Sequence, residues 1–238
     1  HRKGMKAVIL AGGLGVRLRP YTLLAPKPML PLGDRPLLEH MIEWLKSQGI
    51  TEFVIAVGYM RKAIEDYFED GSDLGVRIEY ARSKRPMGTA GQLKTAEHLI
   101  DGRFVLLYGD VLPRADLRPM LDFHGRTGAL ATMMLMKYYT RIRYGLVDAA
   151  EDGRLLRWSE KPEVGGWVNV GCYVMEREFL RYIPDGVPYG MDAAFRAAMD
   201  AGEPVYAYKS EGEFVDIGDR ESYLRASREF LREMGEIP

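Results

Sequence analysis

The sequence predicts an α/β fold: a Rossmann-like, mostly parallel sheet with helices on both faces, followed by a smaller mixed α/β lobe. Two observations predict it. Short apolar runs alternate with amphipathic helical stretches through the first 136 residues. After Tyr138 this alternation gives way to shorter strand candidates. Ligands of such sheets bind beyond the carboxyl ends of the strands, so the loops that follow the strands are the places to look for a site.

In the first half, apolar runs predict buried strands, and apolar residues at helical spacing predict the helices between them. The predicted strands are 7–10, 53–57, 76–81, 104–107 and 129–136. The predicted helices are 36–48, 61–68, 89–99 and 116–126. For the first helix, Pro36 suits the first turn and Gly49 suits the C-terminal cap.

In the second half, short strands are predicted around 145–148, 155–159 and 167–175, and helices near 191–201 and 220–234. The turn Glu151-Asp152-Gly153 predicts a hairpin. We expect this half to form a lobe that covers the first half. The chain then reads as one domain, 5–238, with parts 5–136 and 137–238, and residues 1–4 are expected to be a tag remnant.

Composition narrows the function classes. The 238 residues contain 33 Lys plus Arg against 34 Asp plus Glu, a formal net charge of -1, so a nucleic-acid surface is not expected. No apolar run approaches the roughly 20 residues that span a bilayer, so no membrane partner is expected. The single cysteine, Cys172, excludes an intrachain disulfide and a multi-cysteine metal site. A cytoplasmic location is therefore the expectation.

A glycine-rich loop directly follows the first predicted strand. Gly12, Gly13 and Gly15 let backbone N–H groups approach phosphate oxygens, and Arg17 adds a bidentate donor. The dinucleotide fingerprint needs a third glycine where Leu18 stands, and the Gly-Lys-Ser/Thr of a P-loop is missing. The loop thus indicates phosphate binding, with an ordinary strand-to-helix turn as the alternative.

A lysine stands between two prolines shortly after this loop, in Pro26-Lys27-Pro28-Met29. Prolines stiffen the backbone on both sides of Lys27 and keep it out of a helix interior. Holding such a cation in one place costs little entropy. The functional interpretation is a charge aimed at phosphates, and the alternative is a solvated lysine in a loop.

Taken together, these two segments resemble the signature of the sugar-1-phosphate nucleotidyltransferases, also called nucleotide-sugar pyrophosphorylases. The resemblance continues, in the family's order, through Gly88-Thr89-Ala90-Gly91, Gly109-Asp110, Tyr144-Gly145, Glu160-Lys161-Pro162, Asn169-Val170-Gly171 and Asp216-Ile217-Gly218. It implies the family's reaction, in which an NTP and a sugar-1-phosphate give an NDP-sugar and pyrophosphate with Mg²⁺.

The resemblance also implies roles for individual residues. The catalytic group would be Arg17, Lys27, Asp110 and Lys161. The nucleotide would be bound by Leu10, Ala11, Gly12, Gly13, Gly15, Gly88, Thr89 and Ala90. The sugar phosphate would be bound in the smaller lobe by Tyr144, Gly145, Glu160, Lys161 and Asn169, and Mg²⁺ by Asp110 and Asp216.

Elementary chemistry agrees with these roles. A phosphate monoester has a second pKa near ~6 and is largely dianionic at neutral pH, so it attacks phosphorus without a general base. The reaction then needs positioning and charge neutralisation. Mg²⁺ prefers one or two carboxylates together with substrate phosphates.

The motif Gly88–Gly91, which follows Pro86-Met87, is most similar to the guanylyl-transferring, mannose-1-phosphate branch, here to members without a C-terminal β-helix. GTP and mannose-1-phosphate or a related sugar phosphate are the expected substrates. The alternatives are thymidylyl or uridylyl transfer to glucose-1-phosphate, cytidylyl transfer to another sugar phosphate, and a non-catalytic regulatory paralogue that binds a nucleotide-sugar. A homo-oligomer is compatible with the sequence.

Overall fold

The structure is a computed structural model that describes residues 4–238, so most of the expected tag remnant lies outside the described residues. Its main sheet contains β1 (Lys6–Leu10), β4 (Glu52–Val57), β5 (Arg77–Arg82), β6 (Phe104–Tyr108), β8 (Ala131–Arg141), β11 (Glu163–Met175) and β12 (Val205–Lys209). The seven strands lie in the order β12-β8-β11-β6-β1-β4-β5. All neighbours pair in parallel except β11, which runs antiparallel to both β6 and β8. The predicted mostly parallel sheet is confirmed.

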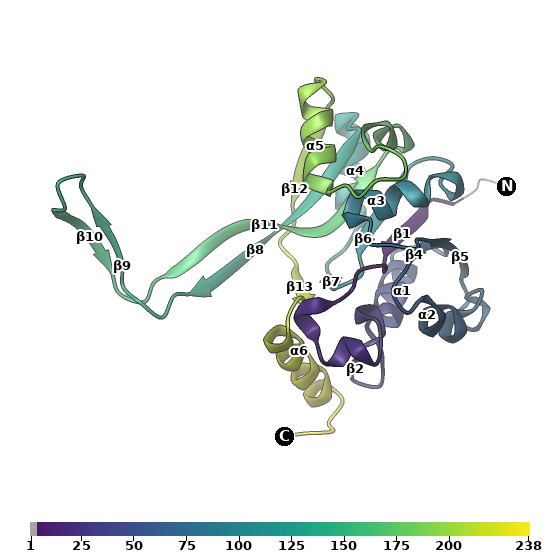
Figure 1. Ribbon diagram of the computed structural model, residues 1–238, viewed down its shortest axis with the longest axis horizontal. Helices are drawn as coiled ribbons and strands as arrows, with labels where there is room; N and C mark the ends of the chain where they lie inside the picture. The colour runs from purple at the N-terminus through teal and green to yellow at the C-terminus, as the bar shows by residue number, and fades with distance from the viewer. Residues whose placement is uncertain (1–3) are drawn as a thin grey trace.

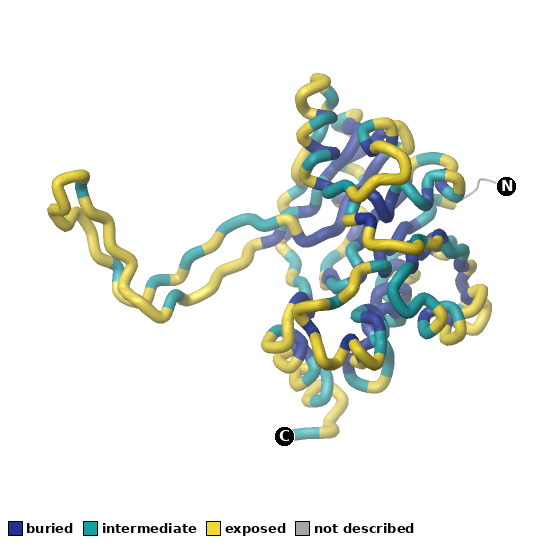
Figure 2. Tube along the Cα trace, viewed as in Figure 1, coloured by how far each residue is buried: buried dark blue, intermediate teal, exposed yellow. Residues whose placement is uncertain are grey.

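Helices cover both faces of this sheet (Figure 1). They are α1 (Leu37–Ser47), α2 (Arg61–Phe68), α3 (Gly88–Thr95), α4 (Arg118–Thr127), α5 (Met191–Asp200) and α6 (Arg220–Glu233). Successive side chains of a strand point to opposite faces. Accordingly, Ala7 and Ile9 of β1 join the core under α1, α2, α4 and α6, and Val8 and Leu10 join the core under α3 and α5. Figure 2 shows this buried interior.

Local sequence signals explain how α1 begins and ends. Pro36 precedes the helix in an extended conformation, with φ -62° and ψ 150°, and Gly49 follows it at φ 89°. A left-handed conformation after the last turn favours glycine. Pro36 lies one position before the first turn, where it was not expected. The helix predicted at 89–99 ends early, at Thr95, and a 3-10 turn follows at Glu97–Leu99.

Short two-stranded pairs complete the fold. They are β2 (Pro31–Leu32) with β3 (Arg35–Pro36), β7 (Val111–Arg114) with β13 (Glu213–Asp216), and β9 (Leu146–Ala149) with β10 (Leu155–Ser159). The last pair is the hairpin predicted from the turn Glu151-Asp152-Gly153. None of the helices within residues 4–238 combines the length and the apolar character needed to cross a bilayer.

The second half differs from the expected covering lobe. β8, β11 and β12 extend the main sheet. Residues 137–168, which we call the arm, project away from the body and carry β9 and β10 at the tip (Figure 1). The reason is the long ladder of β8 and β11, which is paired without interruption from Glu163–Arg141 to Asn169–Leu135. Much of the arm is exposed (Figure 2).

Candidate active site

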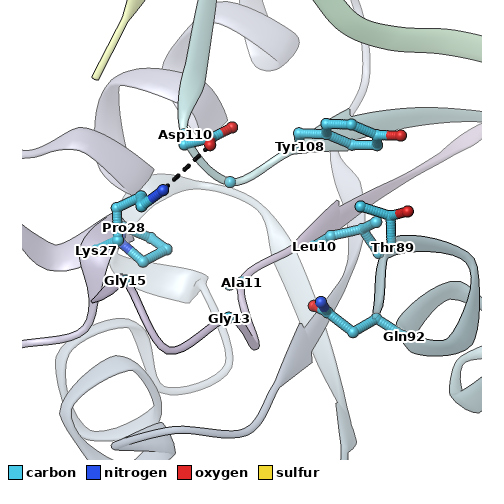
Figure 3. Close-up of a pocket in the computed structure, with 11 residues that line it drawn as sticks. Leu10, Ala11, Gly13, Gly15, Lys27, Pro28, Thr89, Gln92, Tyr108 and Asp110 are labelled. Atoms are coloured by element: carbon cyan, nitrogen blue, oxygen red, sulfur yellow. Dashed lines mark hydrogen bonds and ion pairs between the residues drawn. The ribbon is translucent and has the colours of Figure 1, made fainter. Parts of the chain in front are cut away.

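A cavity of about 150 Å³ lies beyond the carboxyl ends of β1 and β6. Figure 3 shows how segments far apart in the sequence converge on it. Its lining residues are Leu10, Ala11, Gly13, Gly15, Lys27, Pro28, Thr89, Gln92, Tyr108, Gly109 and Asp110. The Gly109 N–H donates to the Leu10 carbonyl at 2.9 Å. A Cβ at Gly109 would collide with that carbonyl, so only glycine allows the two strand ends to approach this closely. The glycine loop and Asp110 are neighbours, as predicted.

Two side chains fix the backbone of the glycine loop through hydrogen bonds. Its Gly12 N–H donates to Gln92 Oε1 at 2.9 Å, and the Thr22 hydroxyl donates to the Gly15 carbonyl at 2.6 Å. Gly15 has φ 63° and leads into a 3-10 turn at Val16–Leu18. Within residues 4–238, the N–H groups of Gly13 and Gly15 have no hydrogen-bond acceptor. Unpaired N–H groups in a glycine-rich loop are donors for an anion.

Lys27 and Asp110 form an ion pair inside the cavity, with Nζ 3.3 Å from Oδ2 (Figure 3). Pro26 is extended, and a 3-10 turn at Lys27–Met29 follows it. The two flanking prolines therefore set the backbone from which the ammonium group reaches the carboxylate. The side chain of Lys27 is 16% exposed and that of Asp110 is 28% exposed, so both charges remain accessible to a ligand.

Asp216 reaches Asp110 through the pairing of β7 with β13. Asp216 is opposite Val111 in this ladder, and the Ile217 N–H donates to the Asp110 carbonyl at 3.3 Å. Burial raises the pKa of Asp216, and the negative charge of Asp110 raises it further. The Gly218 N–H, which donates to the Asp216 carboxylate at 2.7 Å, and the Lys27 charge oppose that shift in pKa. The predicted pair of carboxylates is brought together.

Mg²⁺ is usually bound by only one or two protein carboxylates, and Asp110 and Asp216 supply two neighbouring ones. In the described part of the chain, no group of three or more His, Cys, Asp or Glu residues is arranged so that it could hold a metal ion. A cation bound by Asp110 and Asp216 would therefore complete its shell with substrate phosphates and water. The raised pKa of Asp216 reflects an electrostatic cost that a divalent cation would relieve.

A second cavity of about 280 Å³ adjoins the first and shares Thr89 and Tyr108 with it. The other lining residues are Met133, Asn169, Tyr173, Met191, Asp192 and Phe195. Asn169 Nδ2 donates to the Tyr173 hydroxyl at 2.6 Å, and Asn169 Oδ1 accepts from the Gly171 N–H at 3.0 Å. The predicted residue Asn169 thus lies in the wall of this cavity, fixed by its own loop.

The other predicted residues fall into three groups. Gly12, Gly88 and Ala90 belong to the segments that carry the lining residues without lining the cavity themselves. Arg17 lines a different, open depression together with Asp219. The structure does not bring the last group to either cavity: Tyr144, Gly145, Glu160 and Lys161 all lie on the arm. There Glu160 accepts from Trp158 Nε1 at 3.1 Å.

Sequence reasoning missed several lining residues, among them Gln92, Tyr108 and Asp192. For Gln92 a signal existed, because it lies one helical turn after Gly88, the first residue of the predicted nucleotide-binding motif. For Tyr108 the signal was its position directly before Gly109-Asp110, at the end of a strand. For Asp192 the sequence offered none, because a charged residue in the first turn of a helix is common.

Comparison with known proteins agrees with this geometry. The family model described as "Nucleotidyl transferase" matches residues 6–233. A UTP–glucose-1-phosphate uridylyltransferase from Synechocystis sp. is 35% identical over 95% of the chain, and a mannose-1-phosphate guanylyltransferase from Mycobacterium tuberculosis is 35% identical over 98%. The chain spans 63% and 66% of the lengths of these two relatives.

Among solved structures, HddC from Yersinia pseudotuberculosis complexed with GMP-PN is 25% identical, with a TM-score of 0.75 over 95% of this chain and 100% of that one. A putative glucose-1-phosphate thymidylyltransferase from Bacillus anthracis, 24% identical, has a TM-score of 0.77 over 95% of both chains and shares the fold. The sheet order, the cavity at its carboxyl edge and the match along nearly the whole chain lead to one assignment. This chain belongs to the nucleotidyl transferase family.

Proposed function

We propose that this chain joins an NTP to a sugar-1-phosphate, giving an NDP-sugar and pyrophosphate, with GTP and mannose-1-phosphate or a related sugar phosphate as the favoured pair. One observation carries the proposal. A cavity with free loop N–H groups and a Lys27–Asp110 ion pair adjoins, through Thr89 and Tyr108, a second cavity lined by apolar and polar side chains. Two adjoining compartments suit two substrates whose phosphates must meet.

The reaction divides between these compartments. A sugar phosphate oxygen forms a bond to the α-phosphorus of the NTP. The bond from that phosphorus to the bridging oxygen breaks, and its electron pair leaves on pyrophosphate. Loop N–H groups at Gly13 and Gly15 bind triphosphate oxygens, and Lys27 neutralises the charge that develops on the leaving group. Asp110 and Asp216 would hold Mg²⁺, which supplies further charge neutralisation at the triphosphate.

The remaining walls would position the nucleoside and the sugar. Gln92 fixes the loop through Gly12, and the Thr89 hydroxyl accepts the Met191 N–H at 2.8 Å, tying α3 to α5 at the border of the two cavities. Asn169 and Asp192 offer polar groups to sugar hydroxyls in the second cavity. Glu160 and Lys161 of the arm are proposed to act on the sugar and its phosphate.

Two observations support a guanylyl substrate: the relative from Mycobacterium tuberculosis is named a guanylyltransferase, and the Yersinia structure is described with GMP-PN. A uridylyl substrate is the second candidate, since the relative from Synechocystis sp. is equally similar and is named for UTP and glucose-1-phosphate. A regulatory paralogue that binds a nucleotide-sugar without turnover is the third alternative. It is less favoured because Lys27, Asp110 and Asp216 are all present and converge.

A substrate panel tests the proposal. The protein is incubated with Mg²⁺, each of five NTPs and a set of sugar-1-phosphates, and pyrophosphate release is measured. We expect release with GTP and mannose-1-phosphate or a close relative of it. If UTP with glucose-1-phosphate is used at least ten times more efficiently, the second candidate replaces the first. If no pair releases pyrophosphate although an NDP-sugar binds, the regulatory alternative holds.

Two variants give this assay its controls. Asp110→Asn should lose most turnover while its melting temperature stays near that of the parent. Asp122→Asn removes a carboxylate from the exposed face of α4 and should turn over normally. Near-normal turnover of Asp110→Asn would remove Asp110 from the catalytic group.

A further inference from the structure

The tip of the arm exposes apolar side chains that a surface hairpin does not ordinarily carry. Leu155 is 62% exposed, Leu156 is 61% exposed and Trp158 is 65% exposed. Trp158 stands opposite Val147, itself 41% exposed, in the β9–β10 ladder. Two strands without a packed face are marginally stable in water, and clustered exposed apolar groups mark contact surfaces. The tip therefore requires a surface to cover it.

The accessible surface of the whole chain is also larger than that of a compact monomer of the same mass. Its accessible surface is 13169 Å² at a mass of 27.0 kDa. The scaling for compact monomers gives about 10,800 Å² for that mass, so the chain exposes roughly 2,400 Å² more. A stable interface between two proteins buries about 1,200–2,000 Å² in total. The excess is thus at least as large as the area that a stable dimer buries.

The arm of one chain does not reach its own cavities in this arrangement, because its base is fixed. Lys137 and Lys209 place their ammonium groups 5.3 Å and 5.2 Å from the centre of the Trp167 ring. The Tyr138 ring packs 6.2 Å from that of Phe214. From there the β8–β11 ladder runs outward without a break. The arm projects away from the body (Figure 1). Folding the arm back onto its own body would break these contacts, whereas binding to a second copy would leave them in place.

The described lining residues of the two cavities offer no unpaired cation for a sugar phosphate, whereas the arm carries Lys161. Among the described residues that line them, Lys27 is the one cation, and it is already paired with Asp110. A triphosphate and a sugar phosphate together bring several negative charges. The arm offers Lys161 beside Glu160 at its bend, where Lys161 has a positive φ of 43°. A cation and a hydroxyl acceptor are what the second cavity needs to bind a sugar phosphate.

We propose that two copies of this chain exchange arms, so that the arm of each copy covers the second cavity of the other and delivers Glu160 and Lys161 to it. Such an exchange is reciprocal and closes as a twofold dimer. It buries Trp158 and Leu156 against the partner, and each site becomes complete only in the dimer. The delivery of Glu160 and Lys161 rests on the proposed function, whereas the exchange itself rests on the exposed tip and the fixed base.

Complementation between two inactive chains tests where the arm acts. Asp110→Asn disables the body and Lys161→Met disables the arm, and the two chains are co-expressed with different affinity tags and purified as the mixed dimer. With exchanged arms, one of the two sites in each mixed dimer combines an intact body with an intact arm. About half the wild-type activity per mixed dimer is then expected. No recovery in a mixed dimer, or full activity of Lys161→Met alone, overturns the proposal.

A second measurement needs no substrate. Sedimentation equilibrium should give a dimer for the wild type and a monomer for Leu156→Asp, with similar melting curves. Met234→Asp, a change at an exposed apolar residue at the end of α6, should remain a dimer. Association should shift tryptophan emission to the blue, and Trp158→Phe should abolish that shift. A monomeric wild type that releases pyrophosphate refutes the exchange alone. A dimer with buried Trp158 that releases none refutes the proposed function alone.

Discussion

Lys27 lies 3.3 Å from Asp110, although the two residues are far apart in the sequence and neither belongs to a long helix or to the main sheet. The two charges of this pair cancel, and the formal net charge of the protein is only -1. Any phosphate that enters must therefore be attracted by local groups.

Lys27→Met should reduce kcat/KM for the nucleotide by about 100-fold or more, the size of effect seen when a donor to a developing negative charge is removed. The melting temperature should change little, because a partly exposed ion pair contributes little stability. Steady-state kinetics and a thermal melt measure the two effects. Lys62→Met, on the exposed face of α2, is the matched control and should behave as wild type. Unchanged kinetics in Lys27→Met would exclude contact between Lys27 and the phosphates.

Gly13→Ala should keep the fold and weaken NTP binding, because a Cβ at Gly13 meets nothing within 4 Å in the protein alone. Any effect must then come from a bound phosphate that approaches the loop closely. Isothermal titration with the NTP and a thermal melt check both parts. Gly109→Ala is the contrast: its Cβ collides with the Leu10 carbonyl, so it should lower the melting temperature as well. If NTP binds Gly13→Ala as tightly as wild type, the loop does not hold the triphosphate.

Gln92→Leu should lower the free energy of unfolding by about 1 kcal/mol or more, because the Gly12 N–H loses its acceptor in a partly buried place. Gln92→Glu keeps an acceptor oxygen and should recover part of that loss. Urea denaturation of the three proteins measures the difference. The idea that Gln92 shapes the loop would be abandoned if both variants were equally stable and bound NTP equally.

The buried side chain of His124, which lies away from the site, should make the free energy of unfolding depend on pH. Burial lowers the pKa of His124 from its ordinary 6.5, with a further lowering from the Arg103 charge. Its Nδ1 lies 2.7 Å from the Thr132 hydroxyl, and the side chain is fully buried. The unfolded chain therefore binds the proton more tightly, so the free energy of unfolding should fall as pH drops below about 6.5, by at most about 1.4 kcal/mol per pH unit.

Urea denaturation of wild type and His124→Gln between pH 5 and 8 measures this term, which should be absent from the variant. His98→Gln removes an exposed histidine and should keep the wild-type slope. A parallel pH profile for His124→Gln would show that another group is responsible.

The elements of the body could be predicted from the sequence because their signals are local. In the body, α2 has the predicted bounds Arg61–Phe68, and in the arm β10 has the predicted bounds Leu155–Ser159. The meeting of Gly109 with Leu10 followed from the rule that parallel strands end at the same edge. The direction of the arm could not be predicted, because alternation marks β8 and β11 as strands without showing where their ladder leads. For the same reason, the sequence could not show that Glu160 and Lys161 lie on the arm, away from the cavities in which they were predicted to bind the sugar phosphate.

Because Asp216 lies on β13, the carboxylate pair of the site can form only late in the synthesis of the chain. Asp110 stands near the middle of the chain, and Asp216 joins it only after nearly the whole body has been made. At ordinary translation rates the interval of roughly a hundred residues takes about 5–20 s. A nascent chain can assemble the glycine loop, Lys27 and Asp110 well before it acquires the second carboxylate. A ribosome that stalls late would therefore hold a chain that has the glycine loop, Lys27 and Asp110 but lacks the second carboxylate of the pair.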